Sequence, residues 1–260
     1  MENKKGKFIV IDGLDGIGKG TGINAIIDFL SSSGKKVLDL DKYWREMHFH
    51  PDFENKTVQG KENPYFVNLD DYDVIRSSEP TFTGIGKTIR DEVINKLGRK
   101  YSAYFTASCY SGDRLVLYKR VILPALSKGK IVIQSRSVSS SIVYQFLQSK
   151  IQKENVLSVE EIINLEGNKF VLDNPPDLLI IPTIKNVEEL MERLKNRLEK
   201  DDNCGFENLE FQLQLKPLYE SEEFKNIFTL RGTKVEYIDA GISPEETGRQ
   251  AVNAFNSIIA

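Results

Sequence analysis

The sequence has very few of the residues that build disulfides and metal centres. Its 260 residues include two cysteines and two histidines. Cys109 and Cys204 are far apart and belong to no CxxC pair, so neither a disulfide framework nor a zinc site is predicted. His48 and His50, with Asp52 nearby, have a spacing that could hold a metal. Two histidines and one acid in a loop are more often ordinary surface.

The chain also lacks a strong excess of charge and a long apolar run. Its 35 basic and 38 acidic side chains leave a formal net charge of −3, which argues against a dedicated nucleic-acid or membrane-surface binder. The first apolar run, Phe8 to Ile11, is interrupted by Asp12 and is too short for a signal peptide or a membrane span. We therefore expect a cytoplasmic protein with small-molecule partners.

Short β-rich runs alternate with longer stretches of helical periodicity, which is typical of an α/β fold with a parallel sheet. A chain of this length buries a sizeable core without cross-links, and we expect one domain over residues 1–260. The pattern predicts a five-stranded parallel sheet flanked by helices. The expected strands are Phe8–Ile11, Lys36–Asp41, Ile131–Ile133, Leu178–Ile181 and Val235–Ile238.

Residues 42–71 interrupt this rhythm. The stretch is polar and aromatic, and it shows neither helical nor strand periodicity. We interpret it as an insertion after the second strand.

A glycine-rich segment directly follows the first buried strand and opens the first helix. Its context and spacing match a P-loop. In a P-loop the glycines let backbone N–H groups turn toward phosphate oxygens, and the helix N-terminus adds partial positive charge. The lysine reaches the terminal phosphates, so the segment predicts ATP binding. The segment consists of Gly13, Leu14, Asp15, Gly16, Ile17, Gly18, Lys19, Gly20 and Thr21.

The segment departs from the strict P-loop form at one position. Gly20 stands where a serine or threonine would bind Mg²⁺, and Thr21 follows it. This Gly-Lys-Gly-Thr variant resembles adenylate-kinase-type nucleoside monophosphate kinases. We expect Asp15 and Thr21 to be the residues nearest the metal.

Four further segments, in the same order along the chain, resemble the thymidylate kinase family. Together with the P-loop they make a chance match improbable, and they imply a P-loop kinase fold with a homodimer formed through helices flanking the third strand. The segments are Glu79–Thr83, Gly112–Arg114, Leu123–Ile133 and Ser135–Gln145.

The resemblance implies a site for the nucleotide that accepts the phosphoryl group. Tyr110, one helical turn before Arg114, takes the position of the aromatic that stacks on a pyrimidine, and Arg114 would donate to a base carbonyl. Ser141 and Gln145 would complete the polar edge. Arg136 matches the arginine that binds the acceptor phosphate. Phe82 matches a residue that crowds the 2′ position of the sugar, and Tyr144 is pocket wall or core.

Parts of the family pattern are missing. Ser135 replaces the aspartate that ends the third strand, and Gly16 stands where some relatives have an arginine. The lid segment, about 197–208, carries Cys204-Gly205 where many relatives have Asp-Arg. The cations that could substitute are Arg193, Arg197 and Lys200, although these arginines also fit a solvated ion-pair stripe on a helix.

Phosphoryl transfer needs positioning and neutralisation of the migrating group. We expect transfer of the γ-phosphoryl group of ATP to a deoxypyrimidine monophosphate, with dTMP as the expected acceptor, Mg²⁺ as cofactor, and Lys19, Arg136, Asp15, Arg197 and Lys200 as catalytic residues. Two alternatives stay open. One is a kinase of another nucleotide or of a nucleoside, and the other is a nucleotide-binding protein with little or no transfer activity.

Overall fold

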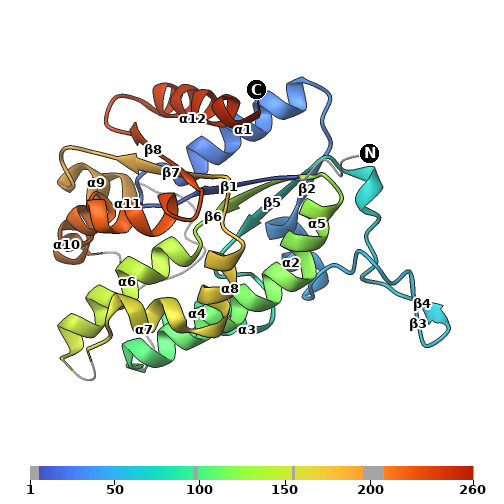
Figure 1. Ribbon diagram of the computed structural model, residues 1–260, viewed down its shortest axis with the longest axis horizontal. Coiled ribbons are helices and arrows are strands. Elements are labelled where there is room, and N and C mark those ends of the chain that lie inside the picture. Colours follow the sequence, from blue (N-terminus) through green and yellow to red (C-terminus); the bar gives the residue numbers. More distant parts are fainter. Residues whose placement is uncertain (1–5, 96–98, 154–155, 196–205, 207, 260) are drawn as a thin grey trace.

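The chain forms a parallel β-sheet with helices on both faces (Figure 1). The computed structural model describes residues 6–95, 99–153, 156–195, 206 and 208–259. Among these residues the central sheet has six strands, all parallel, in the order β2-β5-β6-β1-β7-β8. The strands are β1 (Lys7–Ile11), β2 (Val37–Asp39), β5 (Val74–Ser78), β6 (Ile131–Ser135), β7 (Leu178–Thr183) and β8 (Lys234–Asp239).

Two helices, α1 (Lys19–Ser32) and α12 (Pro244–Ile259), cover one face of the sheet, and α4, α6, α7 and α8 lie on the opposite side (Figure 1). Single-turn π-helices, η2 and η3, follow α3 and α4. The remaining elements are α2 (Leu40–Met47), α3 (Gly84–Thr88), η2 (Ile89–Val93), α4 (Ala103–Leu117), η3 (Tyr118–Ile122), α5 (Leu123–Ser127), α6 (Val138–Gln152), α7 (Val159–Asn164), α8 (Glu166–Asp173), α9 (Glu188–Lys195), α10 (Leu209–Tyr219) and α11 (Glu222–Thr229).

Strand β1 has an uninterrupted apolar run because both of its faces are covered. Ile9 and Ile11 belong to the apolar cluster shared with α1 and α12. Phe8 and Val10 belong to the larger cluster on the opposite face. A strand that is covered on both faces has no polar side, so the run of apolar residues predicted this central position correctly.

The expected count of five strands was wrong because β5 was missed. Its sequence begins with Val74 and Ile75 and continues with Arg76, Ser77 and Ser78, so only its first two residues give an apolar signal. Nevertheless β5 pairs on both sides, with β2 and with β6. The polar second half of the strand lies at the carboxyl end of the sheet, where its side chains reach a cavity.

The structure also corrects the second strand and part of the expected insertion. Strand β2 ends at Asp39, because the Asp39 carboxylate accepts a hydrogen bond from the Lys42 N–H and caps α2. The first residues of 42–71 are therefore helical, with Trp44 fully buried. The same stretch contains a short exposed hairpin, β3 (Thr57–Val58) and β4 (Lys61–Glu62), and a 3₁₀ turn, η1 (Leu69–Asp71).

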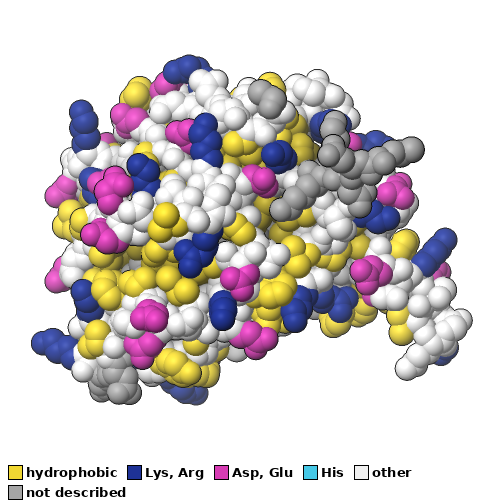
Figure 2. Space-filling view, in the orientation of Figure 1, with side chains coloured by type: hydrophobic (Ala, Val, Ile, Leu, Met, Phe, Trp, Pro, Cys, Tyr) yellow, Lys and Arg dark blue, Asp and Glu magenta, His cyan; other side chains and the backbone are white. Residues whose placement is uncertain are grey.

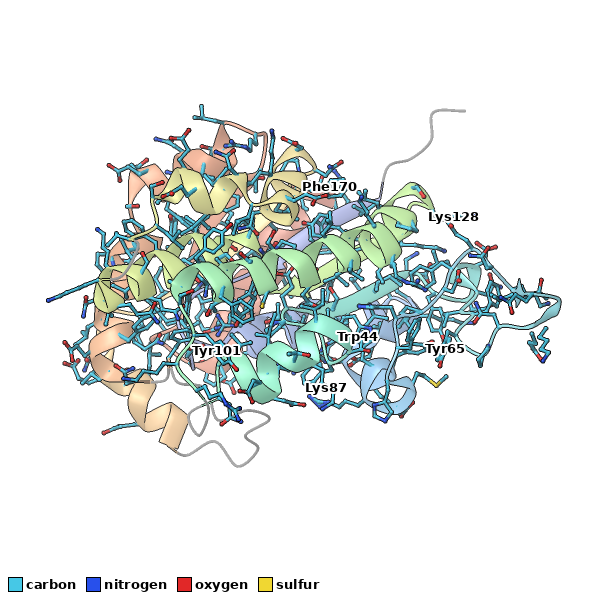
Figure 3. All side chains as sticks on the ribbon, turned by 90° about the horizontal axis from the view of Figure 1, so that it is seen from below. Trp44, Tyr65, Lys87, Tyr101, Lys128 and Phe170 are labelled. Carbon is cyan, nitrogen blue, oxygen red and sulfur yellow. The ribbon has the colours of Figure 1, made fainter. Side chains whose placement is uncertain are left out.

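The hairpin projects from the body of the molecule (Figure 1). Trp44 lies toward the body, and Tyr65 lies farther out toward the hairpin (Figure 3). His50 packs edge-on against Trp44, with ring centroids 5.6 Å apart. Among the described residues there is no group of three or more His, Cys, Asp or Glu side chains arranged to hold a metal ion.

The surface carries charges of both signs. On the face in view, Lys and Arg side chains are interspersed with Asp and Glu side chains (Figure 2), as a net charge near zero predicts. Among the helices of the described residues, none has the length and apolar character needed to cross a membrane.

Candidate active site

A cavity of about 500 Å³ lies at the carboxyl ends of β1, β5 and β6. In open parallel sheets this edge is where ligands bind, because the loops after neighbouring strands diverge there. The cavity brings together most of the residues that the sequence predicted. Those that line it are Asp15, Gly16, Ile17, Gly18, Lys19, Gly20, Thr21, Phe82, Tyr110, Arg114, Arg136, Tyr144 and Gln145. Gly13, Leu14 and Ser141 do not line it but contact residues that do.

The P-loop has the backbone conformation for which its glycines were predicted. Gly13, Gly16 and Gly18 have φ angles of 143°, 75° and 101°, which only glycine adopts without strain. Gly18 forms the N-cap of α1, so the positive end of that helix faces the cavity. Lys19 Nζ donates to the carbonyl oxygens of Gly13 at 3.1 Å and Leu14 at 2.6 Å. The ammonium group therefore lies over the loop.

Arg136 links the end of β6 to the P-loop. Its guanidinium donates to Asp15 and, at 3.2 Å, to Ser140 Oγ, and it lies 5.2 Å from the Tyr144 ring centroid. Burial raises the pKa of Asp15, but the charges of Arg136 and Lys19 outweigh burial and hold that pKa below its usual value. Asp15 is therefore an ionised carboxylate between two cations at neutral pH.

Asp12 directly follows β1 and is fully buried. Its carboxylate accepts hydrogen bonds from the hydroxyls of Ser139, Ser140 at 2.8 Å and Tyr219 at 3.1 Å. Arg136 lies 3.9 Å away. These contacts fix the start of α6 and the end of α10 against the P-loop.

Gln212 on α10 is a site residue that the sequence did not reveal. Its Oε1 accepts from the Asp15 N–H at 2.9 Å, and its Nε2 donates to Asp15 Oδ2 at 2.9 Å. The same Nε2 donates to the carbonyl oxygen of Phe206 at 3.1 Å. The two residues are 197 positions apart, and no local motif marks Gln212, so only the folded chain shows the contact.

Arg114 also lines the cavity and is fully buried. Its Nε and Nη2 lie 2.8 and 2.6 Å from Glu79 Oε2. The guanidinium also donates to Asn168 and, at 3.2 Å, to Ser141 Oγ. Burial raises the pKa of Glu79 to about 7, although Arg114 acts in the opposite direction. Ser141 thus orients Arg114 and does not itself face the cavity.

Aromatic and aliphatic side chains form the wall beside Arg114. Tyr110 and Ile94 line the cavity together with Phe206 and Tyr144. The Phe206 ring lies 5.8 Å from the Tyr144 ring and 5.1 Å from the Phe211 ring. A flat ring bordered by such a wall would gain stacking and apolar contacts.

Phe82 lies in the loop between β5 and α3, with two arginines against its ring. The guanidinium carbons of Arg45 and Arg90 are 3.9 and 3.8 Å from its centroid. Two guanidinium groups that close cannot share one face without overlapping, so they occupy opposite faces. Arg90 also donates to the carbonyl oxygen of Pro80 at 2.6 Å, which fixes this part of the cavity rim.

The basic side chains of the lining suit an anionic ligand. They are Lys19, Arg76, Arg90, Arg114 and Arg136, against the acids Asp15, Asp41 and Glu79. Arg197, Lys200, Cys204 and Gly205 of the expected lid lie outside the described residues, as does the side chain of Arg193, so the structure describes no contact of theirs.

The residues expected near Mg²⁺ fit such an ion in their chemistry. Asp15 offers a carboxylate and Thr21 a hydroxyl, and both line the cavity beside the P-loop. Oxygen atoms are the ligands that Mg²⁺ prefers, and one or two protein oxygens are enough when phosphate oxygens and waters supply the rest.

Comparison with known proteins places the chain in a family. The family model described as thymidylate kinase matches residues 56–246. A thymidylate kinase of Caldicellulosiruptor saccharolyticus is 30% identical over 207 residues, which cover 80% of this chain and 78% of the relative. A protein of Pyrococcus abyssi named as a probable thymidylate kinase is 31% identical, over 68% of this chain and 82% of the relative.

A solved structure supports the same fold. The thymidylate kinase of Candida albicans superimposes with a TM-score of 0.57 at 17% sequence identity, covering 97% of this chain and 92% of that one. The chain therefore belongs to the thymidylate kinase family.

Proposed function

We propose that the protein transfers the γ-phosphoryl group of ATP to dTMP and releases dTDP and ADP. The observation that carries the proposal is one continuous cavity with the P-loop at one end, the wall around Tyr110 and Arg114 at the other, and Arg136 between them. This arrangement suits a donor phosphate chain and an acceptor nucleotide whose phosphates meet beside Arg136. Membership of the thymidylate kinase family supports the same reaction.

In the proposed step an oxygen of the dTMP phosphate attacks the γ-phosphorus. The bond between that phosphorus and the β–γ bridging oxygen breaks, and its electron pair leaves with ADP. Lys19 and Arg136 offset the negative charge of the phosphates, and the P-loop N–H groups hold the donor in line. Asp15 and Thr21 would hold Mg²⁺, which when bound supplies further charge neutralisation.

In the structure both cations have partners within the protein. Lys19 contacts loop carbonyls, and Arg136 contacts Asp15. Phosphate oxygens are better acceptors for cations than neutral carbonyls, so we expect them to take over Lys19. Arg136 would then share its two Nη groups between Asp15 and the acceptor phosphate.

The remaining cation would come from the lid. The candidates in the sequence are Arg193, Arg197 and Lys200, and a further cation near the migrating group would complete its neutralisation. Substitution of each by alanine, measured as kcat, tests which one acts.

We further propose a cytoplasmic homodimer that does not bind nucleic acid. Helix α4 exposes Tyr104, Phe105 and Val116, and a second copy that covers these side chains would remove apolar surface from water. The molar mass in solution, measured by light scattering, tests the dimer.

The decisive experiment measures ADP release with ATP, Mg²⁺ and dTMP. Parallel reactions with dUMP, dCMP and thymidine test the acceptor, since the related Candida albicans enzyme is described as having broad substrate specificity. Turnover with dTMP supports the proposal. Binding of both nucleotides without turnover would instead support a nucleotide-binding protein, an outcome that Ser135 at the cavity makes worth testing.

A further inference from the structure

A glutamine lies at a position of the sheet where an apolar residue is expected. Strand β6 reads Ile131, Val132, Ile133, Gln134 and Ser135, and the Gln134 side chain is fully buried. A buried amide is costly unless its hydrogen bonds are satisfied. The contacts of Gln134 therefore show what it contributes.

Every contact of this amide leads toward the cavity lining. Gln134 Nε2 donates to Glu79 Oε1 at 2.9 Å and to the carbonyl oxygen of Arg136 at 2.9 Å. Its Oε1 accepts from Ser77 Oγ at 3.0 Å. Both N–H groups and the carbonyl of the amide thus have partners, and Gln134 itself does not line the cavity.

Glu79 connects the Gln134 amide to Arg114, the residue proposed to contact the base. One oxygen of Glu79 accepts from Gln134, and the other accepts from Arg114. Glu79, Arg114 and Gln134 are each at most 3% exposed. Hydrogen bonds to a carboxylate in such a dry environment are strong, and they hold the carboxylate and hence the guanidinium in one orientation.

The same amide also contacts the backbone of Arg136, the residue proposed to bind the acceptor phosphate. Arg136 has φ of 64°, a left-handed conformation that costs energy in any residue with a side chain. Its N–H donates to Ile11 O at 3.0 Å, and its carbonyl accepts from Gln134. The two bonds fix both peptide groups of Arg136, so the backbone that aims its guanidinium at Asp15 is held from both sides.

We propose that Gln134 is a positioning residue that couples base recognition to phosphate recognition, by holding the Arg136 backbone and the Glu79 carboxylate with one amide. The inference rests on the proposed function, which places the acceptor base at Arg114 and the acceptor phosphate at Arg136. Gln134 touches neither substrate. It makes the two arginines one rigid unit, so that a nucleotide with the right base also has its phosphate correctly placed.

The test is Gln134→Met, which keeps the length and approximate volume of the side chain and removes its hydrogen bonds. Binding of dTMP and of thymidine is measured by calorimetry, and kcat and the two KM values by a coupled assay. Loss of a buried hydrogen-bond partner should weaken dTMP binding about tenfold. Thymidine lacks the phosphate that Arg136 holds, and Glu79 keeps its bonds to Arg114, so thymidine binding should weaken less than dTMP binding.

The matched control is Gln250→Met on α12, across the sheet. Gln250 makes two hydrogen bonds with its amide, against three for Gln134, and both are to the backbone of Asp239. Gln250→Met removes the hydrogen bonds of a glutamine amide at a position that does not line the cavity. Both dTMP and thymidine should bind this variant as they bind the wild type. Equal effects of Gln134→Met and Gln250→Met on dTMP binding would overturn the role of Gln134.

A second variant keeps the test sharp if Gln134→Met folds poorly. In Gln134→Glu an oxygen replaces Nε2 and faces the Glu79 carboxylate and the Arg136 carbonyl. Its dTMP affinity relative to wild type should be lowest at pH 8 and should partly recover at pH 6, where a proton bound by the acid pair restores one donor. A ratio that does not change with pH contradicts the proposal.

Failure of the proposed function gives a different result. If the wild-type protein neither binds nor phosphorylates dTMP, both the proposed acceptor site and this inference are wrong. Wild-type turnover with an unaffected Gln134→Met variant removes only the inference.

Discussion

Lys19 is the residue for which function can be separated most cleanly from stability. It is partly exposed, and its ammonium group contacts carbonyls of its own loop. Removing it leaves no buried charge without a partner, so the folded state should lose little.

Lys19→Ala should therefore lower kcat by about 100-fold or more, because one well-placed cation contributes that much to charge stabilisation. The melting temperature should stay within a few degrees of wild type. Lys128→Ala, on an exposed turn, is the control. A Lys19→Ala protein with ordinary activity would remove the P-loop assignment.

Tyr110 tests the base site better than Arg114 does. Arg114 is buried and paired with Glu79, and breaking a buried ion pair from one side costs about 3 to 5 kcal/mol of stability. An alanine there would unfold part of the population and confuse binding with folding. Tyr110 is half-buried beside the cavity.

Tyr110→Ala should raise the KM for dTMP about tenfold while the KM for ATP changes less than twofold, since aromatic stacking on a base contributes about 1 to 3 kcal/mol. Phe29→Ala, at an exposed position in the last turn of α1, should change neither constant. Equal increases in both KM values would indicate that Tyr110 supports structure instead.

At the scale of elements, residues 42–71 are anchored to the body by α2 and the residues that follow it. Trp44 is fully buried, and His50 packs against it. Burial, with a smaller contribution from the positive charge of Arg120, lowers the pKa of His50 to about 4. The imidazole is therefore neutral in the folded state across the neutral range.

This pKa predicts acid destabilisation with a definite sign. In the unfolded chain His50 has a pKa of about 6.5. Its contribution to the free energy of unfolding is therefore fully present above pH 6.5, where the imidazole is neutral in both states. That contribution disappears as pH falls toward 4, by about 3 kcal/mol at most. His50→Phe should flatten this part of the dependence of unfolding free energy on pH, measured by urea denaturation.

The sequence predicted elements well where one physical signal dominates. The run Phe8–Ile11 followed by glycines located β1 and the P-loop. It failed at β5, where polar residues of the site occupy half of a central strand, and at α2, whose eight residues are too short for a clear period. Both failures lie at the cavity rim.

At the scale of the whole molecule, the predicted site residues come together because β1, β5 and β6 end at one edge of the sheet and residues of α4 and α6 line the same cavity. The notable omissions, Gln212 and Gln134, have amide side chains whose partners lie on other elements. Amides have no charge pattern or motif, so their roles depend on the tertiary fold. Residues with such signals, such as Lys19 and Arg136, could be found from the sequence.

A site assembled from so many elements links ligand binding to global stability. A dTMP molecule would contact the loop after β5, helix α4 and the start of α6, and unfolding would separate all three. At a concentration 100 times its dissociation constant, a ligand that binds only the folded state stabilises it by about 2.7 kcal/mol. For a chain of this size that corresponds to a rise in melting temperature of about 5 to 10 °C.

Thermal unfolding with and without dTMP measures this rise. ATP without metal should give a separate increase through the P-loop, and Lys19→Ala should reduce the increase from ATP more than that from dTMP. Tyr110→Ala should do the reverse, because each residue lies at one end of the cavity. If dTMP at millimolar concentration leaves the melting temperature unchanged while ATP raises it, the wall around Tyr110 and Arg114 binds a different acceptor, and the same assay run with dUMP, dCMP and thymidine would identify it.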